Sequence, residues 1–119
     1  FLNKEKVLMK KTIKQVQKGF KDIKQSYSSM DKNDFFKDVY KLWNVYLLNK
    51  YEIKLSNLNR EKIKEILIES NVQIENVEAM VKILSVCEMA QYSPLSNEDA
   101  KKTLEDCEDL IKKLEGNVV

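Results

Sequence analysis

The sequence predicts an all-α fold: a small bundle of about five helices, in which a long N-terminal helical hairpin precedes three shorter helices. Glycine occurs twice and proline once in 119 residues, so residues that break helices are scarce. Apolar side chains recur at steps of three and four along most of the chain, as in amphipathic helices. With 43% hydrophobic residues, the chain can bury a sizeable core, so we expect one soluble domain over residues 1–119.

The N-terminal hairpin is expected to consist of a basic helix within residues 1–30 and a second helix that opens the remaining bundle, residues 31–119. On the first helix, from residue 4 to residue 30, the apolar seam comprises Met9, Ile13, Val16, Phe20, Ile23, Tyr27 and Met30. A polar break at residues 28–34 offers N-cap residues for the second helix. Its buried side is expected to carry Phe36, Val39, Tyr40, Trp43, Tyr46 and Leu47.

The third and fourth helices are expected after Tyr51. Asn59 is a candidate N-cap for the third helix, which ends near Asn71. Its inward residues are expected to be Ile63, Ile66 and Leu67. The fourth helix begins near Ile74, and a Tyr-Ser-Pro turn at residues 92–94 ends it, because the residue before proline avoids the helical conformation. Its inward residues are expected to be Val77, Met80, Val81, Leu84, Cys87 and Ala90.

The fifth helix has clear start and stop signals. Ser96 and Asp99 have the spacing of a capping box, and Gly116 is a plausible end. Its inward residues are expected to be Ala100, Leu104, Cys107, Ile111 and Leu114.

The residues that usually carry catalysis are scarce. The chain has no histidine, the commonest general base and a common metal ligand. Cys87 and Cys107 lie at apolar helical positions, which favours buried, reduced thiols in a cytoplasmic protein, with a disulfide between them as the alternative. Neither has an obvious cationic neighbour that would lower the pKa of its thiol. We therefore expect a protein that is not an enzyme and has no cofactor or metal site.

The ends of the chain carry opposite charges. Residues 1–24 hold eight lysines against two acids, whereas residues 96–119 hold seven acids against four lysines. The chain opens on Phe1 and Leu2 without a methionine, so we expect it to begin inside a longer protein. If these residues end a transmembrane helix, the lysines that follow are its flank, on the cytoplasmic face of the inner membrane and near anionic lipid headgroups. This juxtamembrane group comprises Lys4, Lys6, Lys10, Lys11 and Lys14.

The same lysines leave a nucleic-acid-binding helical domain as the alternative, because a basic helix can follow a phosphate backbone. Of the 21 basic residues, however, Arg60 alone is an arginine, the residue best suited to reading bases. The aromatic residues also lie at buried spacings. Nucleic acid is therefore the less favoured partner.

Specific residues also give the chain a resemblance to a known family. They are Phe35-Phe36, Tyr46-Leu47, Lys50, Ile53, Leu55, Leu58, the string Cys87-Glu88-Met89-Ala90-Gln91-Tyr92-Ser93-Pro94, and Leu110-Ile111-Lys112-Lys113-Leu114-Glu115. In this order, after a lysine-rich helix, they resemble the C-terminal domain of the bacterial BatD oxygen tolerance family over nearly the whole chain. The sequence departs from that family's pattern at Tyr51, Met89, Gln91 and Ser93.

The resemblance implies the cytoplasmic tail of a single-span membrane protein whose extracytoplasmic portion is rich in β-structure. It implies protein partners in an envelope complex, such as von Willebrand A-type membrane proteins or a MoxR-type ATPase. It carries over no catalytic residues, so the function that we expect is protein–protein interaction.

The candidate docking residues lie at one turn and on one acidic helix face. Glu88, Gln91 and Tyr92 surround the turn after the fourth helix, and Glu105, Asp106 and Asp109 lie on the last helix. Glutamine at position 91 offers neutral hydrogen bonds only. Tyr92 is expected to pack its ring against the helix end and to bond its hydroxyl locally.

Overall fold

Helices make up the regular structure in the computed structural model, which describes residues 4–93 and 95–116. In chain order the elements are α1 (Lys4–Ser26), the 3₁₀ turn η1 (Tyr27–Ser29), α2 (Lys32–Tyr51), the 3₁₀ turn η2 (Leu55–Asn57), α3 (Arg60–Glu69), α4 (Ile74–Met89) and α5 (Asn97–Leu114). No strand occurs within the described ranges. The predicted all-α bundle, with its long first hairpin, is therefore confirmed.

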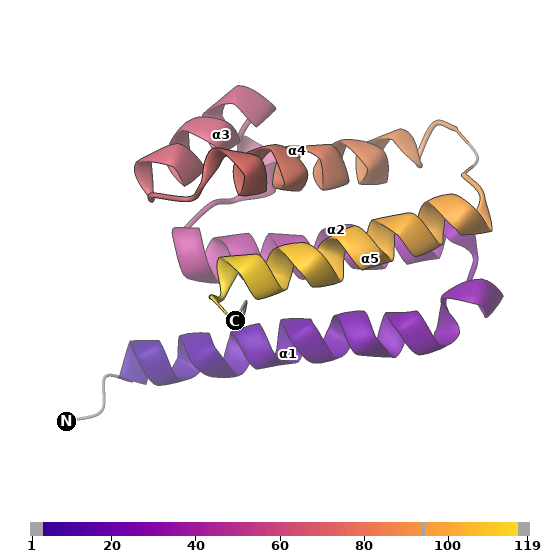
Figure 1. Ribbon diagram of the computed structural model, residues 1–119, viewed down its shortest axis with the longest axis horizontal. Helices are drawn as coiled ribbons and strands as arrows, with labels where there is room; N and C mark the ends of the chain where they lie inside the picture. The colour runs from indigo at the N-terminus through magenta and orange to yellow at the C-terminus, as the bar shows by residue number, and fades with distance from the viewer. Residues whose placement is uncertain (1–3, 94, 117–119) are drawn as a thin grey trace.

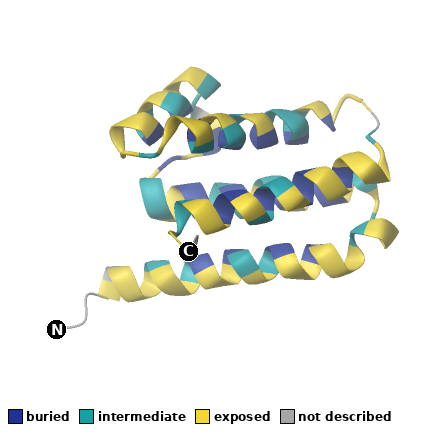
Figure 2. Cartoon of the chain, viewed as in Figure 1, coloured by how far each residue is buried: buried dark blue, intermediate teal, exposed yellow. Residues whose placement is uncertain are grey.

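The helices are arranged in layers within a molecule that measures 47 × 30 × 29 Å. α1 lies at one edge, α2 and α5 occupy the middle, and α3 and α4 lie at the opposite edge (Figure 1). Buried residues of α1 face the middle layer, and exposed residues cover its outer side (Figure 2). In the part of the chain that the structure describes, no helix has both the length and the apolar content that a membrane crossing requires.

α1 and α2 form the predicted antiparallel hairpin (Figure 1). Gly19 of α1 lets the two helices approach closely, because a Cβ atom at this position would lie 2.7 Å from Cδ2 of Leu42. Glycine is unfavourable inside a helix, so its place here follows from packing. The aromatic rings of Phe20 and Trp43 meet across the hairpin with their centroids 5.2 Å apart.

α1 ends earlier than the sequence predicted. It was expected to reach residue 30, but it ends at Ser26 and η1 follows. Serine hydroxyls bond backbone carbonyls at this end: Ser26 donates to the carbonyl of Asp22 over 3.2 Å, and Ser29 donates to that of Ser26 over 3.0 Å. Such bonds offer the backbone an alternative to the regular helix, and the chain reverses here. Tyr27 and Met30 therefore pack against the core from outside the helix.

α2 carries the largest buried side chains. Its N-cap is Asp31, whose carboxylate accepts the backbone N–H of Asn33 over 2.9 Å. Phe35 and Phe36 are both buried and pack edge to face, with ring centroids 4.8 Å apart. The periodicity had placed Phe36 alone on the inward side. Both rings are covered because α2 lies in the middle layer, with neighbours on two sides.

α3 begins and ends where the sequence predicted. The side chain of Asn59 accepts the backbone N–H of Lys62 over 2.9 Å and so caps the helix. Ile63 and Leu67 are buried as expected. After the helix, Asn71 has a φ of 66°, a left-handed conformation that asparagine tolerates well. This residue turns the chain into α4.

Most of the residues predicted to face inward on α4 are buried, but Ile83 takes the place of Val81. Val81 was expected in the core but is half-buried, whereas Ile83 is 3% exposed. The buried stripe takes in Ile83 because α4 packs against α2, α3 and α5 together. The helix ends at Met89, before the Tyr-Ser-Pro string that was expected to stop it; Pro94 itself lies outside the described residues.

α5 opens with the predicted capping box. Ser96 Oγ accepts the backbone N–H of Asp99 over 3.1 Å, and Asp99 Oδ2 accepts the backbone N–H of Ser96 over 2.9 Å. The backbone N–H of Ser96 and its hydroxyl both donate to Asp99 Oδ2, and these two bonds lower the pKa of the Asp99 carboxyl. Beyond the helix, Gly116 has a φ of 69°, as expected for a glycine that follows a helix end.

Candidate docking surfaces

The turn after α4 forms an exposed corner of the molecule. Tyr92 is 86% exposed and Met89 is 52% exposed, although both are large and apolar in part. The backbone N–H groups of Tyr92 and Ser93 each donate to the carbonyl of Met89 over 3.0 Å. These bonds hold the turn in one shape. We call Met89, Gln91, Tyr92 and Ser93 the Tyr92 corner.

The exposure of Tyr92 contradicts the expected packing of its ring. We expected the ring to seal the helix end, but the turn carries it outward, and Ala90 takes the inward place at 8% exposure. No hydrogen bond of the Tyr92 hydroxyl occurs among the described residues. Because Tyr92 is 86% exposed, its ring is available to another molecule.

A hollow of about 350 Å³ lies beside the Tyr92 corner, between the start of α2 and the turn. Its lining is Asp31, Lys32, Asn33, Phe36, Ala90, Gln91, Tyr92, Ser93 and Leu95. Gln91 and Tyr92, two of the predicted docking residues, thus share one wall of this hollow. The structure brings them together as the sequence suggested.

Glu88, the third residue predicted at this turn, is engaged elsewhere. Its Oε2 atom accepts a hydrogen bond from Nη2 of Arg60 over 2.5 Å and so ties α4 to the start of α3. The two side chains remain 47% and 41% exposed. Glu88 therefore lies on the side of α4 that faces α3. The spacing of apolar residues in the sequence did not indicate its pairing with Arg60.

The acidic residues of α5 divide into paired and exposed ones. Asp106 lies 3.9 Å from the ammonium of Lys102, and Glu108 lies 3.4 Å from that of Lys24, which joins α5 to α1. Glu105 and Asp109 are exposed, and neither forms an ion pair within the described ranges. They lie one helical turn apart, so a basic group of a partner could contact both.

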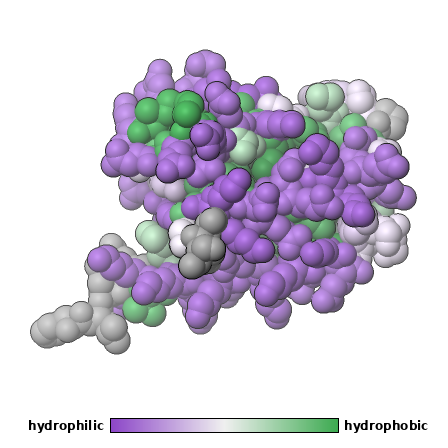
Figure 3. Space-filling model, viewed as in Figure 1, coloured by the Kyte–Doolittle hydropathy of each residue, from purple (hydrophilic) through white to green (hydrophobic). Residues whose placement is uncertain are grey.

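The exposed side of α1 is rich in lysine and reaches α5 at Lys21 and Lys24; we call these lysines the lysine face. It comprises Lys4, Lys6, Lys10, Lys11, Lys14, Lys18, Lys21 and Lys24, and all eight are exposed. Figure 3 shows hydrophilic residues along the edge that α1 occupies. Val7 and Leu8, near the start of the helix, are 49% and 62% exposed between these lysines. Positive charge and apolar groups thus share one end of the lysine face.

The two cysteines are buried and reduced, as predicted. Burial raises the pKa of the Cys87 thiol to about 12, and the nearby Glu88 carboxylate adds to this effect. Burial also raises the pKa of the Cys107 thiol well above its usual value, although a hydrogen bond from Trp43 acts in the opposite direction. Neither thiol is poised as a nucleophile near neutral pH.

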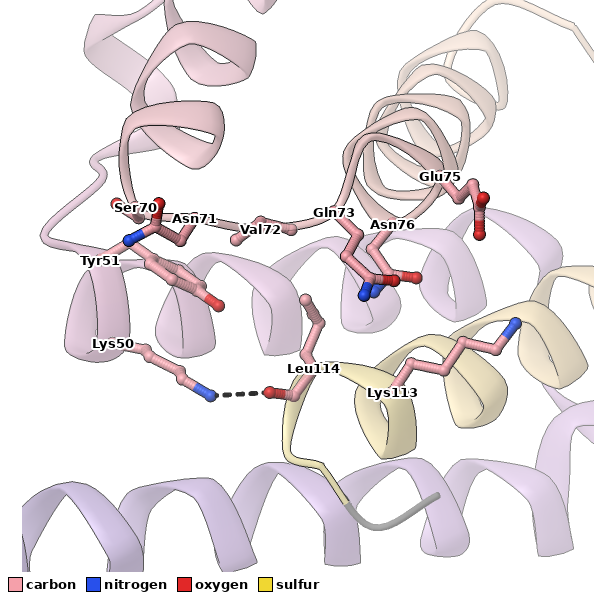
Figure 4. A pocket seen from close by; sticks show the side chains of 10 residues that line it. All are labelled: Lys50, Tyr51, Ser70, Asn71, Val72, Gln73, Glu75, Asn76, Lys113 and Leu114. Carbon is pink, nitrogen blue, oxygen red and sulfur yellow. Dashed lines mark hydrogen bonds between the residues drawn. The ribbon is translucent and has the colours of Figure 1, made fainter. Parts of the chain in front are cut away.

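A cleft of about 620 Å³ lies where α2 and α5 end and α4 begins. The amide groups of Gln73 and Asn76 point into it, towards Leu114 (Figure 4). Lys50, at its lower side, donates to the backbone carbonyl of Leu114 over 3.1 Å and pairs with Glu115. The charge of Lys50 is thus neutralised within the chain, so this lysine holds the end of α5.

No group of three or more cysteine, aspartate or glutamate residues in the described ranges is arranged to hold a metal ion. No protein family, curated protein or solved structure matches the chain. The resemblance to the oxygen tolerance family therefore stays a prediction from the residues quoted above.

Proposed function

We propose that the domain is a non-enzymatic protein-interaction module that docks a partner through the Tyr92 corner. The observation that carries this proposal is the exposure of Tyr92 and Met89, which lie three positions apart where α4 ends in a turn whose backbone is fixed by hydrogen bonds. Aromatic residues are the commonest anchors of protein interfaces, and a rigid turn loses little entropy on binding. The adjoining hollow gives a partner side chain a place to enter.

A second surface orients the module. We propose that the lysine face of α1 lies against anionic lipid headgroups on the cytoplasmic face of the inner membrane. Lysines near such a surface each contribute about 1 kcal/mol, and Val7 and Leu8 are exposed at the end where apolar contact with lipid would add to this. α3 and α4, at the opposite edge of the bundle, would then face away from the lipid (Figure 1).

The biological setting that we propose follows the family resemblance. The domain would be the tail of a single-span bacterial protein in an envelope complex for oxygen or stress tolerance. Its partners would be von Willebrand A-type membrane proteins or a MoxR-type ATPase. The exposed acids Glu105 and Asp109 offer such a partner a site for a basic residue.

The alternative, a nucleic-acid-binding domain, would use the same lysine face. Eight exposed lysines on one helix supply enough charge to follow a phosphate backbone. Substitutions at the Tyr92 corner distinguish the two functions. Nucleic acid binding would need neither Tyr92 nor Met89, whereas protein docking at the corner would need both.

Co-purification from cells tests the docking function on the full-length protein. We expect a defined set of partners with the native chain and their loss with the double variant Met89→Ser, Tyr92→Ala. The matched control is Lys101→Ala, which alters an exposed residue of α5 outside the corner. Retention of every partner by the double variant would rule out docking through the Tyr92 corner.

A further inference from the structure

Exposed apolar side chains gather at one end of the bundle. Seven large ones are exposed among the described residues, and five of them lie at this end: Val7 and Leu8 near the start of α1, Leu48 near the end of α2, Ile68 near the end of α3 and Ile74 at the start of α4. α1 and α2 are antiparallel, so the start of α1 lies where α2 ends (Figure 1). The turn from α3 to α4 lines one cleft with the end of α2. Exposed apolar groups gathered in this way indicate an interaction surface.

Lysines surround the apolar residues at the start of α1. Val7 and Leu8 are 49% and 62% exposed, and Lys4 and Lys11 lie within about one helical turn of both. Both lysines are exposed, and neither forms an ion pair with another described residue. We call Lys4, Val7, Leu8 and Lys11 the Val7 patch. Its apolar centre is thus bordered by positive charge.

Glutamates surround the apolar residues at the turn from α3 to α4. Ile68 and Ile74 are 49% and 55% exposed, and Figure 3 shows apolar side chains over α3. Residues 65–81 hold four glutamates and no lysine or arginine. Two of these glutamates, Glu69 and Glu78, are exposed and form no ion pair within the described ranges. We call Ile68, Glu69, Ile74 and Glu78 the Ile74 patch.

The two patches are complementary in charge, and both have an apolar centre. A contact between them buries apolar surface and pairs lysine with glutamate. α1 lies at one edge of the bundle and α3 and α4 at the other, with α2 and α5 between them, so a molecule cannot join its own two patches (Figure 1). A twofold axis at this end, perpendicular to the plane of Figure 1, places the Val7 patch of each copy against the Ile74 patch of the other. A contact of this symmetry closes at two copies.

We propose that the domain forms an end-to-end dimer with a second copy of itself, in which the Val7 patch and the Ile74 patch meet twice. The dimer goes beyond docking at the Tyr92 corner, because that corner follows the end of α4 and the Ile74 patch includes its start. The corner stays free in the dimer. Lipid and the second copy compete for Val7 and Leu8, so the dimer is a state of the domain away from lipid.

Sedimentation equilibrium without lipid tests for the dimer. At low salt we expect one transition from monomer to dimer as the concentration rises from about 5 to about 500 µM. High salt should reduce the fraction of dimer, because it screens the charge contacts. Leu8→Ser should weaken the dimer at least about tenfold, since the substitution occurs twice in a twofold contact. A monomer throughout this range, or growth beyond a dimer, would overturn the proposal.

Charge reversal identifies the two patches. Lys4→Glu with Lys11→Glu gives a chain whose two patches are both acidic, and Glu69→Lys with Glu78→Lys gives a chain whose two patches are both basic. Each variant alone should be monomeric, because every contact would join like charges. An equimolar mixture of the two variants should form a dimer again, because every contact then pairs opposite charges.

The matched control changes the same charges elsewhere. Lys37→Glu with Lys41→Glu alters two exposed lysines of α2 outside both patches, and this variant should dimerise as the native chain does. A dimer of either patch variant alone would overturn the pairing of the two patches. So would a mixture that stays monomeric, or a control that loses the dimer.

Discussion

The indole nitrogen of Trp43 donates a hydrogen bond of 3.1 Å to the sulfur of Cys107, and both side chains are fully buried. The two residues lie 64 positions apart, so this bond joins α2 to α5 in the middle layer. Trp43 also packs edge to face on Tyr46, with ring centroids 5.5 Å apart. A thiol thus serves here as a structural acceptor for a buried donor.

Replacing each cysteine by alanine measures the contribution of this bond. Cys107→Ala leaves the Trp43 N–H without an acceptor. Cys87→Ala removes an equivalent buried thiol that accepts no hydrogen bond from Trp43. We expect Cys107→Ala to lower the free energy of unfolding by about 1–2 kcal/mol more than Cys87→Ala does. Urea unfolding followed by the fluorescence of the single tryptophan measures both values. Equal losses would show that the hydrogen bond adds nothing.

The buried thiols should make the fold sensitive to alkali. Burial raises the pKa of Cys87 to about 12 and that of Cys107 well above its usual value. Above a pH of about 8.5 the unfolded chain therefore loses thiol protons that the folded chain keeps, so the free energy of unfolding falls as pH rises. Each thiol should contribute a fall of about 2 kcal/mol between about pH 8.5 and about pH 10.

Urea titrations at several alkaline pH values measure this slope, and the double variant Cys87→Ala, Cys107→Ala is the control. Its free energy of unfolding should depend less steeply on pH over the same range. Tyr46 and Tyr51 also have a raised pKa through burial, so a smaller fall should persist in the control above about pH 10. The same slope in both proteins would contradict the role of the thiols.

The end of α5 should depend on Lys50. This lysine pairs with Glu115 and donates to the Leu114 carbonyl, and the paired side chains are only 24% and 17% exposed. Tyr46 donates a further hydrogen bond of 2.5 Å to Glu115. Lys50→Met would leave that carboxylate without its cation, so we expect a loss of about 2–3 kcal/mol in the free energy of unfolding.

Lys62→Met is the matched control for Lys50→Met. Lys62 lies 3.3 Å from Glu65, but these side chains are 57% and 60% exposed, so the change should stay within about 0.5 kcal/mol. Thermal unfolding of both variants gives the comparison. Similar small changes in the two would mean that the Lys50 network does not hold the end of α5.

The lysine face should bind anionic vesicles. We expect co-sedimentation with vesicles that contain phosphatidylglycerol, none with pure phosphatidylcholine, and weaker binding as salt rises. Lys11→Glu with Lys18→Glu should weaken binding at least about tenfold. Lys37→Glu with Lys41→Glu makes the same charge change on α2 and should have a much smaller effect. Tight binding to duplex DNA with a steep salt dependence would instead favour the nucleic-acid alternative.

Local signals made much of the fold predictable. The caps at Asp31, Asn59 and Ser96 depend on residues within three positions, and the structure forms all of them. The end of α1 was missed because it depends on where the chain must reverse to pack as a hairpin. The burial of Ile83 was not predicted because it depends on the packing of α4 against three neighbouring helices.

The sequence also predicted some features of the candidate docking surfaces and missed others. Gln91 and Tyr92 fall on one turn because they are neighbours in sequence, so their proximity was predictable. The exposure of the Tyr92 ring was not, since it depends on the direction of the turn. The bond between Arg60 and Glu88 spans 28 positions, and no periodicity indicates it.

Site-specific photo-crosslinking in cells is the most direct test of docking at the Tyr92 corner. A photoreactive amino acid replaces Tyr92 in the full-length protein, and a second sample carries it at Lys101 on the exposed side of α5. We expect one discrete protein adduct at position 92, identified by mass spectrometry, that is absent at position 101 and is lost when Met89→Ser is added. No adduct at position 92, or the same adduct at both positions, would contradict docking through this corner.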